Sequence, residues 1–254
     1  MRTPSTNLRV RAFTLIELLV VIAIIAILAA MLFPAIGVAK KKAAEASARA
    51  DMQNISLAIG RFEADYNGRF PAPWVQTGVS DATYGYSGGT AIAGVTNFVN
   101  NSNVIAILLD LEYTKEATPR PTANVGHLLN PRRIANLNAK FTGDTSSGGV
   151  GPDLEYRDPW GTPYVISMDT SLDERVRDQV YTRRSVSQEA GQKGMFGLSN
   201  PTPGGNSDEF SLSGKFMIWS LGADKKADTA PNPTQPPYGS AKTGVNKDNL
   251  LSWQ

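Results

Sequence analysis

The sequence contains no cysteine and only one histidine, His127, in 254 residues. The absence of cysteine excludes disulfides, thiolate nucleophiles and cysteine-ligated zinc. A single histidine supports neither a catalytic triad nor a histidine-based metal centre. We therefore expect His127 to pack in a loop or at the surface, and we expect the protein not to be an enzyme.

The sequence also lacks a large excess of charge of either sign. Its 25 basic and 23 acidic side chains leave a formal charge of +2, which is too small to argue for nucleic acid as a partner. The strongest basic cluster is Lys40 to Lys42. We interpret it as a solvated or headgroup-facing group, and a contact with acids on a neighbouring copy of the chain is the alternative.

Long apolar runs are absent except in residues 13–37. Every residue from Leu18 to Phe33 is apolar, which approaches the ~20 residues that a helix needs to cross a bilayer. Glu17 stands near the start of this run. Because placing a carboxylate in the hydrocarbon of a bilayer costs roughly 2.5 kcal/mol or more of free energy, we expect Glu17 to have a partner and a functional role.

A short basic leader, residues 1–12, precedes the apolar run and contains three arginines and no acid. A secretory signal peptide also has a basic leader, an apolar stretch and a small residue at its cleavage site, but its small residue follows the apolar stretch. Here the small residue, Ala12, comes first. A cut after Ala12 would remove the leader and keep the apolar helix in the mature chain.

This arrangement resembles the N-terminal signal of type IV pilins and type II secretion pseudopilins. The matching residues are Arg9, Arg11 and Ala12, followed by the string FTLIE from Phe13 to Glu17, and the family usually has Gly where Ala12 stands. The resemblance implies that a prepilin peptidase cuts before Phe13 and methylates its new amine. It also implies that Glu17 supports methylation and filament assembly, and that Pro34 is the proline that kinks the first helix.

The helical pattern continues after residue 37, with apolar residues at helical spacing up to Phe62 and an Asn67-Gly68 pair to end it. A continuous helix from Phe13 to Asp65 would be about 80 Å long. The resemblance implies an α+β, type IV pilin-like fold, in which a long N-terminal helix packs on a small antiparallel sheet with long loops. We divide the chain into a leader (1–12), a transmembrane or filament-core helix (13–37), the second half of that helix (38–66) and an αβ domain (67–254).

Within the domain, residues 99–111 have apolar side chains on one face and predict a short second helix. The string DPWGTPY at residues 158–164 resembles a turn of type II major pseudopilins that enters a strand, here over residues 164–168. The best strand pattern lies in residues 209–221. Residues 169–184 are charged, and we interpret their acids, Asp173, Glu174 and Asp178, as members of solvated ion pairs rather than catalytic groups.

The string SLGADKKAD after that strand resembles the calcium loop of major pseudopilins. The resemblance implies oxygen ligands from Leu221 (by its carbonyl), Asp224 and Asp228, with Asn246 and Asp248 from the C-terminal tail. Oxygen ligands of these types suit calcium. Three neighbouring lysines lower the negative charge of the region, so a metal-free turn closed by Asx hydrogen bonds remains the alternative.

The resemblance implies a structural subunit of a pseudopilus that drives type II secretion, and the lack of cysteine and the two domain motifs favour this reading. A type IV pilin of an extracellular adhesion or motility fibre is the alternative. The expected location is the inner membrane, crossed once, with the leader in the cytoplasm and the domain in the periplasm. The expected partners are other copies in a helical filament, the prepilin peptidase, the assembly platform and minor pseudopilins.

The first prediction concerns processing. Because the leader is basic and Ala12 directly precedes Phe13, the native mature protein is predicted to begin with N-methylated Phe13. The measurement is the intact mass of the protein isolated from its own membrane. A mature chain that begins after the apolar run would identify an ordinary signal peptide and would contradict the resemblance.

Overall fold

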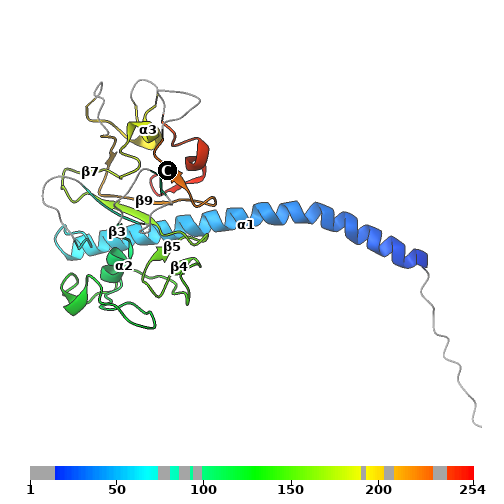
Figure 1. Ribbon diagram of the computed structural model, residues 1–254, viewed down its shortest axis with the longest axis horizontal. Coiled ribbons are helices and arrows are strands. Elements are labelled where there is room, and N and C mark those ends of the chain that lie inside the picture. The colour runs from blue at the N-terminus through cyan, green and yellow to red at the C-terminus, as the bar shows by residue number, and fades with distance from the viewer. Residues whose placement is uncertain are drawn as a thin grey trace, which may run out of the picture. The chain divides into compact units, whose positions relative to one another are not determined.

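The computed structural model describes residues 15–73, 81–85, 92–93, 99–189, 193–202, 209–230 and 239–254. The chain divides into two compact units, Met1–Ala43 and Ala44–Gln254. The first helix, α1 (Leu15–Asp65), runs through both units (Figure 1). The expected α+β class is confirmed, because the second unit packs this helix on a small sheet.

Helix α1 continues without interruption past Pro34 and ends at Asp65. Asn67 and Gly68 then take φ angles of 54° and 83°. These residue types tolerate the left-handed region, so the predicted helix end is confirmed. The buried residues of α1 form one face of the helix, with each three or four positions from another, and all lie in its second half: Ala48, Met52, Ile55, Ala58, Ile59 and Phe62.

The main sheet has five short strands in the order β11-β9-β6-β1-β3. Its strands are β1 (Ala82–Gly85), β3 (Val99–Asn100), β6 (Val165–Met168), β9 (Phe216–Ser220) and β11 (Leu250–Leu251). All neighbours are antiparallel except β1 and β3, which run parallel, so the sheet is mixed. The strands predicted in residues 164–168 and 209–221 are its central pair.

Smaller elements surround this sheet. Three two-stranded pairs are β2 (Ile92–Ala93) with β10 (Ala227–Asp228), β4 (Gly149–Val150) with β5 (Tyr156–Arg157), and β7 (Arg175–Val176) with β8 (Leu212–Ser213). The short helices are α2 (Ser102–Leu108), α3 (Arg184–Ser187), η1 (Val125–His127), η3 (Met195–Gly197) and η4 (Gly244–Asp248).

Alternate residues of the central strands enter two different hydrophobic cores. Ile166 and Ile218 face the core that contains the buried side of α1 and residues 104–108 of α2. Val165 and Trp219 belong to a second core, which includes buried side chains from residues 176–186, 195–198 and 241–251. Because successive side chains of a strand point to opposite faces, the sheet is buried on both sides.

The helix expected over residues 99–111 is shorter in the structure. Val99 and Asn100 pair with β1 as the edge strand, and α2 covers only Ser102–Leu108. Every residue from Val104 to Leu108 is buried. The expectation of a single apolar face is therefore wrong, because residues 104–108 are buried in the first core on all sides, whereas Ser102 and Asn103 are only partly buried.

The DPWGTPY segment forms a tight turn around the Asp158 carboxylate. Asp158 is fully buried and accepts hydrogen bonds from the backbone N–H groups of Trp160 and Thr162, at 3.0 and 2.9 Å. Its other oxygen accepts from the hydroxyls of Thr162 and Ser220, each at 2.6 Å. Burial raises the pKa of Asp158, and these hydrogen bonds oppose that rise. The Trp160 ring is only partly buried, against the first core.

Asp178 corrects the interpretation of residues 169–184 as a solvated insertion. Asp173 does form an exposed ion pair with Arg177, at 2.8 Å. Asp178, however, is 1% exposed and accepts hydrogen bonds from Ser167 Oγ at 2.7 Å and Trp219 Nε1 at 3.0 Å. Its second oxygen accepts from the backbone N–H groups of residues 180 and 181. Asp178 thus ties this segment to the second face of the sheet.

The second prediction follows from the four hydrogen bonds to Asp158. Asp158→Ala leaves two buried hydroxyls and two N–H groups without their acceptor, so it should lower the free energy of unfolding by about 3 kcal/mol. The measurement is urea unfolding of fragment 37–254, which contains both cores. The matched control is Asp173→Ala, which removes an exposed acid and should cost less than about 1 kcal/mol. Equal losses in both variants would contradict the role of Asp158.

Candidate functional site

The first half of α1 presents apolar side chains on all sides. Among the described residues, α1 is the one helix whose length and composition allow it to cross a membrane. Leu15 is 76% exposed, and Phe33 at the other end of the apolar run is 72% exposed. An exposed apolar surface of this extent requires lipid or other apolar helices to cover it.

Glu17 lies in the first turn of α1 and is exposed on this apolar segment. A carboxylate in the first turn is favoured by the partial positive charge of the helix N-terminus. The predicted cleavage residues, Ala12 and Phe13, lie outside the described residues. Glu17 is four residues after Phe13, the residue that the predicted processing would leave at the N-terminus.

The structure brings together two acids of the predicted calcium loop, Asp224 and Asp248. The backbone N–H of Asp224 donates to Asp248 Oδ2 at 3.1 Å. Asp248 Oδ1 is buried and has no hydrogen-bond partner among the described residues. Gly222 takes a φ of 72°, and a Cβ there would lie 2.2 Å from the Asp248 carbonyl oxygen. Glycine is thus required for the close approach of the tail to this loop.

The other two polar residues of the predicted loop pair with each other. The Asp228 backbone N–H donates to Asn246 Oδ1 at 2.9 Å, and Asn246 Nδ2 donates to the Asp228 carbonyl at 2.8 Å. The Asn246 amide is therefore engaged in joining β10 to η4. Leu221 is buried in the second core beside this region.

Short-range hydrogen bonds of the Asx type also close the loop. Asp224 Oδ1 accepts from the backbone N–H of Lys226, and Asp228 Oδ1 accepts from that of Ala230, both at 2.9 Å. Desolvation, together with the charge of Asp248, raises the pKa of Asp224. Within the described ranges no group of three His, Cys, Asp or Glu side chains could hold a metal ion. A cation here would bind the two carboxylates and take its remaining ligands from carbonyl oxygens and water.

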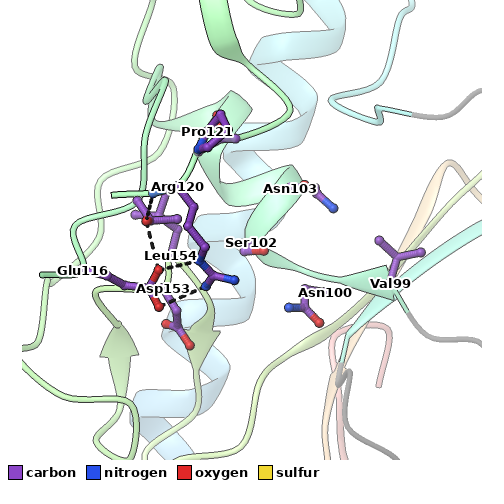
Figure 2. A pocket seen from close by; sticks show the side chains of 11 residues that line it. Val99, Asn100, Ser102, Asn103, Glu116, Arg120, Pro121, Asp153 and Leu154 are labelled. Atoms are coloured by element: carbon purple, nitrogen blue, oxygen red, sulfur yellow. Dashed lines mark hydrogen bonds and ion pairs between the residues drawn. The ribbon is translucent and has the colours of Figure 1, made fainter. Parts of the chain in front are cut away.

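A cavity of about 600 Å³ lies between the edge strand β3 and residues 114–122 (Figure 2). Asn100, Ser102 and Asn103 line one side of it, and Glu116, Arg120 and Asp153 line the other. The motifs of the sequence give no indication of this cavity, because its two sides come from separate segments that meet only in the folded domain.

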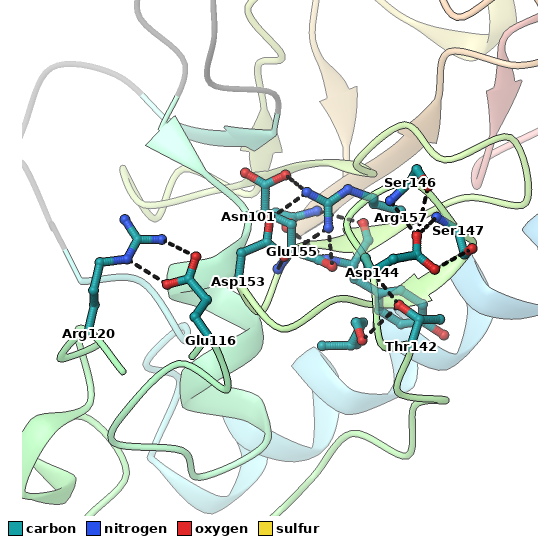
Figure 3. A network of polar contacts seen from close by, with 12 residues as sticks. Asn101, Glu116, Arg120, Thr142, Asp144, Ser146, Ser147, Asp153, Glu155 and Arg157 are labelled. Carbon is teal, nitrogen blue, oxygen red and sulfur yellow. Dashed lines mark hydrogen bonds and ion pairs between the residues drawn. The ribbon is translucent and has the colours of Figure 1, made fainter. Parts of the chain in front are cut away.

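A buried ion cluster adjoins the cavity (Figure 3). Arg157 Nη2 lies 2.5 Å from Asp153 Oδ2 and 2.7 Å from Glu155 Oε2. Burial raises the pKa of Glu155 to about 7, against the opposing effect of the Arg157 charge. His127 lies in a separate loop cluster, 2.7 Å from Asp110 and 3.1 Å from Glu112.

The third prediction concerns the pH dependence of stability. The pKa of Glu155 is higher in the folded state than its ordinary 4.5, so the folded state binds the proton more tightly. Its contribution to stability is present below pH 4.5 and is lost as the pH rises to 7, a loss of about 3 kcal/mol. Glu155→Gln should remove this loss and make fragment 37–254 more stable than wild type at pH 8. The measurement is urea unfolding between pH 5 and pH 8.

Glu116→Gln is the control for this prediction, because Glu116 hydrogen bonds with Arg120 and has a lowered pKa. It should not gain stability at pH 8. Parallel pH profiles of wild type and Glu155→Gln would contradict the prediction.

Comparison with known families identifies the N-terminal segment. The model described as the prokaryotic N-terminal methylation motif matches residues 7–33, which include the predicted cleavage site and Glu17. Comparisons with curated proteins and with solved structures found no match. The matched segment includes the exposed apolar part of α1 from Leu15 to Phe33. The chain therefore carries a prepilin-type N-terminal methylation motif on an apolar helix suited to membrane anchoring.

Proposed function

We propose that the protein is a structural subunit of a pseudopilus that drives type II secretion. The observation that carries the proposal is the exposed apolar half of α1 with Glu17 in its first turn. The folded domain contains no part of this segment, so its apolar surface is available to lipid before assembly and to other copies after it. The DPWGTPY turn around Asp158 adds support from the domain.

In this proposal the prepilin peptidase cuts after Ala12 and methylates Phe13 at the cytoplasmic face of the inner membrane, while the domain lies in the periplasm. The assembly platform then extracts each subunit, and minor pseudopilins join it in the filament. Glu17 would face the charged amine of Phe13 from a neighbouring subunit. Such a buried ion pair is favourable only with good geometry, so it would form only when neighbouring subunits are in the correct register. We call this effect the register check.

A type IV pilin of a surface fibre is the second candidate, because it would use the same motif and the same helix. The absence of cysteine and the two pseudopilin-like motifs of the domain favour the pseudopilus. Filament length in cells distinguishes the two, because a pseudopilus stays within the envelope. Long surface fibres formed at natural expression levels would favour the pilin.

The fourth prediction tests the register check. Glu17→Ala should leave the protein in the membrane, because removal of an acid favours insertion. It should abolish filaments, because the amine of the neighbouring Phe13 loses its partner. Membrane fractionation measures the first effect, and electron microscopy of sheared filaments measures the second.

Leu18→Ala is the matched control, since it shortens a side chain at the adjacent position and removes no charge. It should still assemble. Normal filaments from Glu17→Ala would rule out the register check, and failure of both variants would point to packing rather than charge.

We further propose that Asp224 and Asp248 share a calcium ion. The buried, unpartnered Asp248 Oδ1 supports this, because an oxygen in that position lacks the donor that burial normally requires. Asp224 lies beside it with a raised pKa, as expected for neighbouring acids without a cation between them. Asp228 and Asn246 would support the site through their hydrogen bonds, and Leu221 by its carbonyl oxygen.

The fifth prediction tests the calcium proposal by thermal melts of fragment 37–254. Calcium at 100 times its dissociation constant should stabilise the fragment by about 2.7 kcal/mol, and magnesium should do much less. Asp248→Asn keeps an acceptor for the Asp224 N–H but removes a charge, so it should abolish the shift. Asp173→Asn removes an exposed acid elsewhere and should preserve it. Identical melts with chelator and with calcium above millimolar concentration would leave the Asx-bonded, metal-free loop as the correct description.

A further inference from the structure

We propose that His127, together with Asp110 and Glu112, forms a proton-dependent clip that holds residues 125–128 against the chain that follows α2. His127 Nδ1 lies 2.7 Å from Asp110 Oδ1, and Nε2 lies 3.1 Å from Glu112 Oε1. The two acids follow the C-terminus of α2, whereas His127 is the last residue of η1. The clip lies outside α1 and outside the predicted calcium loop, so it does not depend on the proposed function.

Both contacts of the ring can be hydrogen bonds only if the clip holds an additional proton. An ionised carboxylate only accepts hydrogen bonds, and a neutral imidazole has a single N–H donor. A neutral ring between two carboxylates would therefore direct the lone pair of one ring nitrogen at a carboxylate oxygen. The imidazolium donates from both nitrogens and satisfies both acids. A protonated carboxyl group that donates to a neutral ring would hold the same additional proton.

Other donors also hold the two carboxylates in place. Asn124 Nδ2 donates to Asp110 Oδ1 at 3.1 Å, and the Gly126 backbone N–H donates to Glu112 Oε2 at 2.9 Å. The His127 side chain is 18% exposed, which limits the replacement of its contacts by water. In the described part of the chain, Asp110 and Glu112 are the charged side chains within ion-pair distance of the ring. Each can accept a charge-assisted hydrogen bond from the imidazolium.

The segment that the clip holds has few apolar contacts of its own. No residue of η1 is buried, and Leu128 is 74% exposed. His127 has a φ of 55°, in the left-handed region that is uncommon for residues other than glycine. The flanking residues Asn124 and Asn130, in contrast, are fully buried. Loss of the clip should therefore release residues 125–128 while both ends of the segment stay in place.

A metal ion shared by the same three side chains is a different explanation. The two nitrogens of the ring face different carboxylates, so one ion could not replace both contacts. Within the described ranges no group of three His, Cys, Asp or Glu side chains could hold a metal ion. The geometry therefore favours a proton.

The closed clip binds one more proton than a released segment with a neutral ring and two ionised carboxylates. The contribution of the clip to stability is therefore present at acidic pH and is lost as the pH rises. Glu155 acts in the same direction, because burial raises its pKa to about 7. Glu155→Gln removes this second effect, and it serves as the background for the exchange measurements.

The first measurement is solid-state NMR of the full chain in phospholipid nanodiscs, with 15N-labelled histidine and an unlabelled scaffold protein. His127 is the only histidine, so its two ring nitrogens give the only labelled ring signals. Both nitrogens should be protonated at acidic pH, and the loss of one proton should occur at a lower pH in Glu112→Gln than in wild type. A ring with one protonated nitrogen at acidic pH, or no difference between the two chains, would overturn the proposal.

The second measurement is the protection of the Gly126 and His127 amides from hydrogen–deuterium exchange. It compares about pH 5.5 with about pH 8.5, on either side of the ordinary titration of histidine near 6.5. Protection should fall about tenfold at the higher pH, the effect of one lost charge-assisted hydrogen bond. Glu112→Gln should keep its protection at both values. Its amide oxygen can accept from the Gly126 N–H while its amide nitrogen donates to the neutral ring.

Glu116→Gln is the matched control, because Glu116 is a nearby acid that pairs with Arg120 and not with the ring. It should keep the pH dependence of the background chain. His127→Ala should have low protection at both pH values. Equal protection of the background chain at the two pH values would overturn the proposal, and so would a Glu112→Gln variant that loses protection as the background does.

Discussion

The small central sheet must bury both of its faces, and α1 can cover only one of them. Its five strands are two to five residues long, so strand pairing alone gives little stability. The first face packs on α1 and α2. The second packs on side chains from residues 176–186, 195–198 and 241–251, which contain only short strands and short helices. These segments cover a face of the sheet whose apolar side chains would otherwise be exposed.

Two buried carboxylates fasten the loops on these faces, in a chain without cysteine. Asp158 ties the turn before β6 to Ser220 of β9 on the first face. Asp178 ties the segment after β6 to Trp219 on the second face. Each carboxylate organises adjacent backbone N–H groups and also reaches a neighbouring strand. The loops are therefore held in position by hydrogen bonds to these carboxylates, and the bonds are lost if a carboxylate is protonated or replaced. A disulfide would instead hold a loop by a covalent bond.

Local patterns predicted the parts of the fold that depend on local chemistry. The helix end at Asn67-Gly68 and the strand after DPWGTPY follow from turn residues and from periodicity. The burial of Asp178 could not be predicted from the charge pattern of residues 169–184, because that pattern does not show which strand side chains, here Ser167 and Trp219, the carboxylate reaches in the fold. The α2 burial was missed for a similar reason, since one-sided periodicity cannot show that a second layer covers the other side. The cavity beside β3 depends entirely on long-range packing.

The two units differ in whether their apolar side chains are exposed or buried. Residues of the first unit carry exposed apolar side chains, whereas the cores begin at Ala48 in the second unit. A substitution in the apolar run therefore changes an exposed surface and removes no core residue of the domain. A substitution at a core or carboxylate position changes domain stability with the apolar surface intact. The domain can consequently acquire features such as the polar cavity without altering the helix that carries the methylation motif.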